Sequence, residues 1–455
     1  MEPAARPDPA SDAEAHAVSD GLTAADARAR LDFLAELGYG FLESGQTGGQ
    51  TERELRACGR SLGLSRMEFN STGRLVLLEA ALPDGGSVSL SGAARALDLI
   101  DCTRAKALSD LAAEVTGEVA SGDAGRSAAR EPRPSRTAQR ALLEAASAEV
   151  RRLRDTATPW WAVALGMTML AFCISMQVGV TWRAWVSAAV VQLVSSMVGA
   201  GIARARPPRL FAVAVQSSAA GAFATLLVQL GFVDPVGAAA AIAVNWLLLL
   251  PLPQMIGAVA DAIEADFLSA LTRVASVGMA ALGIFIGGAV TFTLGELLGM
   301  EHPRLDSLPS FPWYLVLVFS ALGAVANAFA NGGRLPLVLP AAALGLLTAA
   351  GSQVLLHAVG LPALWASSIA AVLLGVLSSA ISTHTGYPQP VLALMGVTGA
   401  LLPGIPVFFG ILQEMGEGSG LSYFGEAAAI CLGIGTGAAL GVYLASLFRL
   451  TGRAR

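Results

Sequence analysis

The sequence predicts an α-helical membrane protein in which ten transmembrane helices form two inverted five-helix repeats behind a small N-terminal α/β domain. Three observations predict this architecture. Only 14% of the residues are charged, whereas soluble domains carry about 25%. The long apolar runs are confined to residues 159–455. Landmarks in the first half of this region recur in the second half at a nearly constant spacing, which indicates an internal repeat.

The predicted helices follow from the length of the apolar runs. About 20 consecutive apolar residues cross a bilayer, and ten segments satisfy this requirement. The segments are residues 159–180, 184–203, 210–232, 236–258, 267–296, 312–331, 335–358, 362–382, 389–412 and 424–448. Arginines gather before the first segment, in the second and sixth connections and in the C-terminal tail. The positive-inside rule therefore places both termini of an inner-membrane protein in the cytoplasm.

Three prolines mark the internal repeat. Each lies at or near the start of a segment, or inside one, and each has a counterpart 152 to 154 positions later. The pairs are Pro159 and Pro312, Pro208 and Pro362, and Pro251 and Pro403. A repeat of five helices is odd in number, so the second copy must enter the membrane from the opposite side. Inverted repeats of this kind are typical of alternating-access transporters.

The soluble part of the chain divides by composition. The predicted domain organisation is a disordered tail (1–27), a cytoplasmic α/β domain (28–125), a linker with an amphipathic helix (126–158), repeat 1 (159–298), an extracytoplasmic connection (299–311) and repeat 2 (312–455). Within the α/β domain we expect helices over 28–43, 51–62 and 94–119, the second opened by a capping box of Thr51 and Glu54. The only histidine before the membrane region, His16, lies in the tail, which favours a regulatory or assembly role over catalysis.

Two predicted helices carry breaks at matching repeat positions. Proline removes an N–H group and clashes with the preceding turn, so backbone carbonyls become available at membrane depth. Such carbonyls can bind an ammonium group, and the N-terminus of a half-helix can bind a carboxylate. A simple kink is the alternative interpretation. The break residues are Pro251 and Pro253 in the fourth segment and Pro403, Gly404 and Pro406 in the ninth.

Polar residues precede both breaks. Asn245 lies six positions before Pro251, and Thr398 lies five positions before Pro403. We predict that both contact a substrate, although intramembrane polar groups can also serve only to join helices.

A cluster of ionisable residues follows the fourth segment. It comprises Asp261, Glu264, Asp266 and Arg273, and Arg273 could pair with either aspartate. Ionisable groups near a bilayer usually have a partner or a function, so these residues are candidates for gating or coupling, as is Glu414 after the second break. The alternative is a solvated loop with one ion pair.

Other classes of site are not indicated. The four cysteines show no CxxC or metal-ligand spacing, no cofactor motif is present, and no basic tract suggests nucleic acid. Gly283 and Gly287, like Gly437 and Gly441, have the GxxxG spacing that predicts close helix packing.

Three stretches of the sequence resemble the bacterial threonine/serine exporters across nearly the whole ordered chain. They are LDFLAELGYGFLESGQTGGQTERELRACGRSLGL, LLLLPLPQMIGAVADAIEADFLSALTRV and TGYPQPVLALMGVTGALLPGIPVFFGI. The resemblance implies a cytoplasmic domain before ten helices and export of L-threonine and L-serine driven by the proton motive force. It also implies that Asp261, Asp266 and Arg273 match the charged pattern of the family. One departure is Leu252, where the family usually has glycine.

The resemblance leaves two alternatives. Some relatives divide the halves between two chains and export dicarboxylates, so a succinate-like substrate is the second hypothesis. The third is a membrane sensor whose cytoplasmic domain binds a ligand. In the preferred interpretation the chain is not an enzyme. Its partners are an amino acid, protons and membrane lipid, and a homo-oligomer is left open.

Overall fold

The computed structural model of the chain describes residues 22–64, 66–95, 97, 100–124, 136–178, 181–299, 312–401, 404–415 and 419–453. The chain divides into two compact units. Unit 1 holds residues up to 99 together with 104–157, and unit 2 holds residues 100–103 and 158–455. Most of the predicted disordered tail and connection 299–311 lie outside the described residues.

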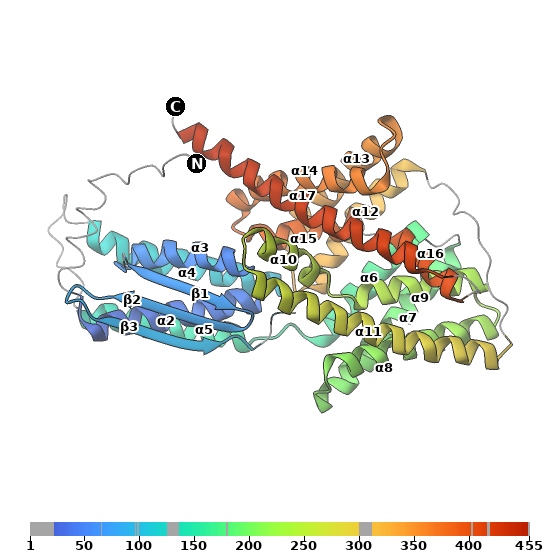
Figure 1. Cartoon of the computed structure of the whole chain (residues 1–455), viewed down its shortest axis with the longest axis horizontal. Helices are drawn as coiled ribbons and strands as arrows, with labels where there is room; N and C mark the ends of the chain where they lie inside the picture. The colour runs from blue at the N-terminus through green and yellow to red at the C-terminus, as the bar shows by residue number, and fades with distance from the viewer. Residues whose placement is uncertain are drawn as a thin grey trace. The chain divides into compact units, whose positions relative to one another are not determined.

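Unit 1 combines helices with a small antiparallel sheet (Figure 1). The strands pair in the order β1-β2-β3. The elements are α2 (Ala24–Glu43), α3 (Gly48–Ser61), β1 (Met67–Thr72), β2 (Leu75–Ala81), β3 (Ser87–Ala93), α4 (Cys102–Ala124) and α5 (Arg136–Asp155). Burial alternates along β2, so one face of the sheet is covered, and β2 and β3 contact α2 while β1 contacts α3.

Helix α2 lies at the centre of unit 1. It contacts the sheet and α3 as well as α5, and its leucine and phenylalanine side chains are completely or almost completely buried. Because neighbours surround α2, it is apolar over more of its circumference than a one-sided amphipathic helix would be. The burial of α2 by several elements explains why its sequence shows little amphipathic contrast.

Three helix starts differ from the prediction. Helix α2 begins at Ala24, four residues before the predicted boundary, because the Thr23 side chain accepts a hydrogen bond from the Asp26 amide. The predicted capping box of Thr51 and Glu54 is wrong, since the box that opens α3 consists of Thr47 and Gln50. Helix α4 starts at Cys102 instead of residue 94, because the strand-like pairing of β3 continues to Ala94, whose amide bonds the Arg74 carbonyl.

Unit 2 consists of helices. They are α6 (Trp160–Val178), α7 (Trp182–Ile202), α8 (Arg209–Gln229), α9 (Pro235–Leu249), α10 (Leu252–Ile263), α11 (Phe267–Leu297), α12 (Trp313–Ala330), α13 (Leu335–Gln353), α14 (Ala363–Thr385), α15 (Gln389–Ala400), α16 (Gly404–Met415) and α17 (Leu421–Arg453). A π-helical turn over Val354–Ala358 extends α13. The helices thus lie over all ten predicted segments.

The number of membrane crossings is bounded by length and hydropathy. Within the described residues, seven helices are long and apolar enough to cross a membrane, or up to nine if α5 with α6 and α9 with α10 each form one span. Helices α15 and α16 flank residues 402–403, which lie outside the described part, and enter neither count. The chain is therefore a multi-pass helical membrane protein, and ten crossings stay a prediction.

The helix contacts inside the two halves of unit 2 correspond pair by pair. In the first half α6 contacts α7, α7 contacts α8 and α9, α8 contacts α9 and α11, and α10 contacts α11. In the second half α12 contacts α13, α13 contacts α14 and α15, α14 contacts α15 and α17, and α16 contacts α17. These contacts correspond when helices are matched in chain order, as does the contact of α6 with α9 to that of α12 with α15, whereas the small contact between α9 and α11 has no such counterpart among the described helices.

Glycines line the two most extensive helix contacts of the described residues, α8 with α11 and α14 with α17. A Cβ added at Gly283 would lie 2.7 Å from the carbonyl oxygen of Leu210, and one at Gly437 would lie 2.2 Å from that of Ser368. The close packing predicted from the GxxxG spacing is confirmed. The glycines at the two crossings form three pairs separated by 154 positions: Gly221 and Gly375, Gly283 and Gly437, and Gly287 and Gly441.

Candidate functional site

The first break separates α9 from α10, whose axes differ by 47°. Pro251 and Pro253 have no N–H group, so the carbonyls of Leu247 and Leu249 lack the donor that would bond them four residues later in a continuous helix. The first donors of α10 are used locally, because the Gln254 amide bonds the Pro251 carbonyl at 2.9 Å. The break therefore offers more carbonyl acceptors than N–H donors.

Asn245 lies one and a half turns before the break and is fully buried. Its Nδ2 donates to Oε1 of Gln192 on α7 at 2.8 Å, and Gln192 Nε2 donates in turn to the Ser196 hydroxyl at 3.3 Å. Among the described residues, neither Oδ1 of Asn245 nor the neighbouring indole Nε1 of Trp246 has a hydrogen-bond partner. Buried polar atoms without partners are costly, so this part of α9 is suited to a polar ligand.

The second break lies between α15 and α16. Gly404 begins α16 and Pro406 is buried in its first turn. Pro403 lies outside the described residues, as does the side chain of Thr398 near the end of α15. The predicted pairing of Thr398 with Asn245 as substrate ligands therefore stays a prediction.

The halves of the broken helices pack across the two halves of unit 2. Helix α16 contacts α9, and Val407 and Phe408 of α16 belong to the apolar cluster that surrounds α9. Helix α10 contacts α17. A Cβ added at Gly435 of α17 would lie 2.8 Å from Cβ of Val259 on α10. Each broken helix thus bridges the first and second halves.

Arg273 and Asp261 form a buried ion pair beyond the first break. Nε of Arg273 lies 2.7 Å from Oδ2 of Asp261, with side-chain exposures of 3% and 0%. Nη1 of Arg273 also donates to Oε1 of Gln254 at 3.1 Å, and Gly257 leaves space for the guanidinium. The alternative of a solvated loop is wrong for this pair. Arg273 joins α11 to two turns of α10 and so fixes the half-helix that follows the break.

The other ionisable candidates have separate environments. Asp266 caps α11 by accepting a hydrogen bond from the Ser269 amide at 3.1 Å, so it is not the partner of Arg273 in the ion pair. Glu264 is exposed at the end of α10. Glu414, exposed on α16, accepts a hydrogen bond from the Gly420 amide at 2.8 Å. Of the predicted charged residues, Asp261 and Arg273 are brought together as an ion pair.

Sequence reasoning missed three residues of this region. Gln254 follows Pro253, Trp246 follows Asn245, and Gln192 lies on α7. A polar residue next to a helix break is a usable signal for Gln254, whereas the pairing of Gln192 with Asn245 depends on how α7 packs against α9. Among the described residues, no group of histidine, cysteine and acidic side chains could hold a metal ion.

These helices and their breaks fall inside the part of the chain that matches known proteins. The family model described as "Putative threonine/serine exporter" matches residues 135–295 and 302–445, which is more than half of the chain. The chain belongs to the threonine/serine exporter family.

One relative supports the same assignment. The protein named "Probable threonine/serine exporter" from Mycobacterium tuberculosis (strain ATCC 25618 / H37Rv) is 28% identical over 304 residues, which cover 64% of this chain. The chain spans about 56% of the length of this relative. No solved structure matches the chain significantly.

Proposed function

We propose that this threonine/serine exporter family member is a secondary active exporter of small polar amino acids, L-threonine and L-serine first, driven by the proton motive force. The observation that carries the proposal is the break after α9. Backbone carbonyls that lack a helical donor lie there close to buried side-chain atoms without a hydrogen-bond partner among the described residues. The family model matches this part of the chain. Such breaks near the midplane form the substrate sites of many secondary transporters.

The chemistry at the break fits a zwitterion, with more acceptors for the ammonium group than donors for the carboxylate. The carbonyls of Leu247 and Leu249 and Oδ1 of Asn245 are acceptors, which suit an ammonium group. The indole N–H of Trp246 is a donor for a carboxylate or a side-chain hydroxyl. In this proposal Thr398, Pro403, Gly404 and Pro406 supply the corresponding surface from the second half.

The buried pair of Asp261 and Arg273 would act as the cytoplasmic gate. It locks α10 against α11, so movement of α10 must carry the pair with it or separate it. Separating two buried charges is costly unless each is hydrated or protonated, which provides a route to proton coupling. Asp266, Glu264 and Glu414 would then shape the approach at the helix ends.

Alternating access would follow from two inverted five-helix repeats. The matching helix contacts, the glycine pairs 154 positions apart and the family match in two stretches support the repeat. Because each broken helix packs on both halves, rocking one half against the other would open the site to one side at a time.

Transport by purified full-length protein in liposomes tests the proposal. We expect an imposed pH gradient to drive labelled L-threonine and L-serine against their concentration gradients. Asn245→Ala should raise KM for threonine about tenfold, the loss expected when one hydrogen bond to a charged group disappears. Gln216→Ala is the matched control, because the hydrogen bond that Gln216 Nε2 donates stays within its own helix, to the Ala212 carbonyl at 3.2 Å. No uphill flux in the wild type would refute the proposal.

Dicarboxylate export is the second candidate, and the charge balance disfavours it. A dicarboxylate requires cationic ligands, but Arg273 is already neutralised by Asp261. Succinate competing at low micromolar concentration against threonine flux would reverse this preference. Tight ligand binding without any flux would favour the third hypothesis, a membrane sensor.

A further inference from the structure

A pocket lies at the start of α9, at the end of the helix opposite the break. Its volume is about 510 Å³, and it is lined by Thr181 to Arg183 and by Gly231 to Asp234. This volume is within the roughly 300–1,000 Å³ of small-molecule sites. Helix α9 has 15 residues, so the pocket and the break are separated by about 22 Å along one helix.

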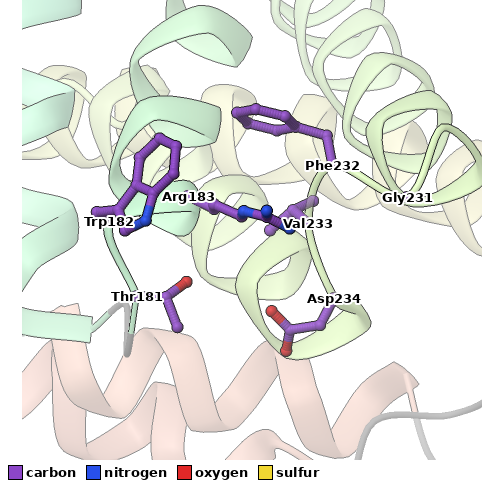
Figure 2. Close-up of a pocket in the computed structure, with 7 residues that line it drawn as sticks. All are labelled: Thr181, Trp182, Arg183, Gly231, Phe232, Val233 and Asp234. Atoms are coloured by element: carbon purple, nitrogen blue, oxygen red, sulfur yellow. The ribbon is translucent and has the colours of Figure 1, made fainter.

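Opposite charges face the same pocket. Figure 2 shows the guanidinium of Arg183 and the carboxylate of Asp234 among the lining side chains, with the Thr181 hydroxyl on the wall opposite Asp234. Asp234 caps α9 by accepting from the Gly237 amide at 3.4 Å, and Thr181 caps α7 by accepting from the Ala184 amide at 3.4 Å. These caps fix the two oxygens at the pocket.

Aromatic rings form another part of the pocket. Trp182 and Phe232 meet edge to face with their centroids 6.3 Å apart, and the Arg183 guanidinium lies 5.8 Å from the Trp182 ring centroid. The ring holds the guanidinium by a cation–π contact while leaving its N–H groups in the plane for a carboxylate. The pocket therefore presents an anion, a cation and a hydroxyl within apolar walls.

We infer that this pocket is a second binding site for a zwitterionic α-amino acid, with Asp234 bound to its ammonium group and Arg183 to its carboxylate. The inference rests on the proposed function, which places this end of α9 on the extracytoplasmic side, where an exported amino acid leaves. The site belongs to one side of the membrane only, because the repeat spacing of 154 places Pro388 where the first half has Asp234. The second half therefore lacks the acid at the equivalent position.

Protection from labelling tests the site in the full-length protein. In a variant without native cysteines, Thr181→Cys introduces a thiol into the pocket, and Leu230→Cys introduces one beside it, where Leu230 is exposed and does not line the pocket. We expect L-threonine to slow labelling of Thr181→Cys by a membrane-impermeant maleimide ~10-fold, the effect of about 90% occupancy, and to leave Leu230→Cys unchanged. Equal effects at both positions would indicate a global change and overturn the site.

Two charge variants identify the recognised groups. Asp234→Asn keeps a capping oxygen but removes the charge, and Arg183→Gln removes the cation, so either should abolish protection by L-threonine. Threoninol, which lacks the carboxylate, should protect weakly in the parent and equally weakly in Arg183→Gln. Protection that persists in both variants overturns the site. If L-threonine fails to protect Thr181→Cys although transport is normal, the second site is also overturned. If L-threonine protects but no transport occurs, only the exporter function is refuted.

Discussion

Arg273 is the residue on which the conformation of α10 depends most directly. Its guanidinium bonds Asp261 and Gln254, which lie two turns apart on α10, and it does so from α11. Removing one partner of a buried ion pair leaves an uncompensated charge, and this costs more than removing both. The distinction separates the structural role of the pair from its proposed role as a gate.

We predict that Asp261→Asn and Arg273→Gln each lower the free energy of unfolding by about 3 kcal/mol, because each leaves one buried charge. The double variant should recover much of this loss in a thermal unfolding experiment, yet it should not recover pH-driven transport if the pair is the gate. Glu426→Gln, at an exposed position on α17, is the control and should change neither property. Recovery of transport in the double variant would limit the pair to a structural role.

Glu43 gives unit 1 a definite pH dependence. Burial opposes its ionisation, but hydrogen bonds from Arg154 at 2.7 and 2.9 Å and from the Arg95 amide outweigh burial and lower the pKa of Glu43. Since the folded pKa is depressed, this stabilisation is fully present above the ordinary value of 4.5 and is lost as the pH falls through the folded value.

We therefore predict that Glu43→Gln destabilises unit 1 at neutral pH by about 3 kcal/mol and weakens its further loss of stability below pH ~4.5. Hydrogen exchange of α2 and α5 in the full-length protein, corrected for intrinsic exchange, measures both effects. Glu36→Gln is the control, because Glu36 binds the same arginine but is partly exposed. Equal effects of the two variants would contradict the assignment of the stabilisation to Glu43.

At the scale of elements, the two glycine-lined helix crossings make a prediction about the repeat. Gly283→Val and Gly437→Val place a branched side chain against the backbone of the facing helix, where no rotamer change can relieve the contact. We expect both to reduce the yield of folded protein in size-exclusion chromatography by a similar, severalfold factor. Gly278→Val and Gly425→Val lie on the same helices in open space and should be tolerated. Tolerance of the first pair would show that the crossings are not the close contacts described.

For the whole molecule, the sequence is most informative in the membrane region, where contact with lipid determines which residues are apolar. The apolar runs locate every helix of unit 2, because lipid requires about 20 apolar residues, and prolines locate the first break. The start of α3 differs from the prediction because Thr47-Gly48-Gly49-Gln50 and Thr51 to Glu54 offer two capping boxes, and the structure forms the first and buries Thr51 within the helix. The ion pair and the bond between Asn245 and Gln192 depend on helix packing, which periodicity does not encode.

Inversion of the repeats makes the last prediction, which concerns topology. Residues 154 positions apart are equivalent, so inverted halves must place them on opposite sides of the membrane, whereas parallel halves would place them on the same side. The test positions lie at helix ends: Ala205 with Val359, and Leu230 with His384. With both termini cytoplasmic, cysteines at 230 and 359 should react with an impermeant maleimide in intact cells, and cysteines at 205 and 384 should react only after permeabilisation. If both cysteines of either pair reacted from the same side of the membrane, inversion would be excluded, and with it the five-helix repeat.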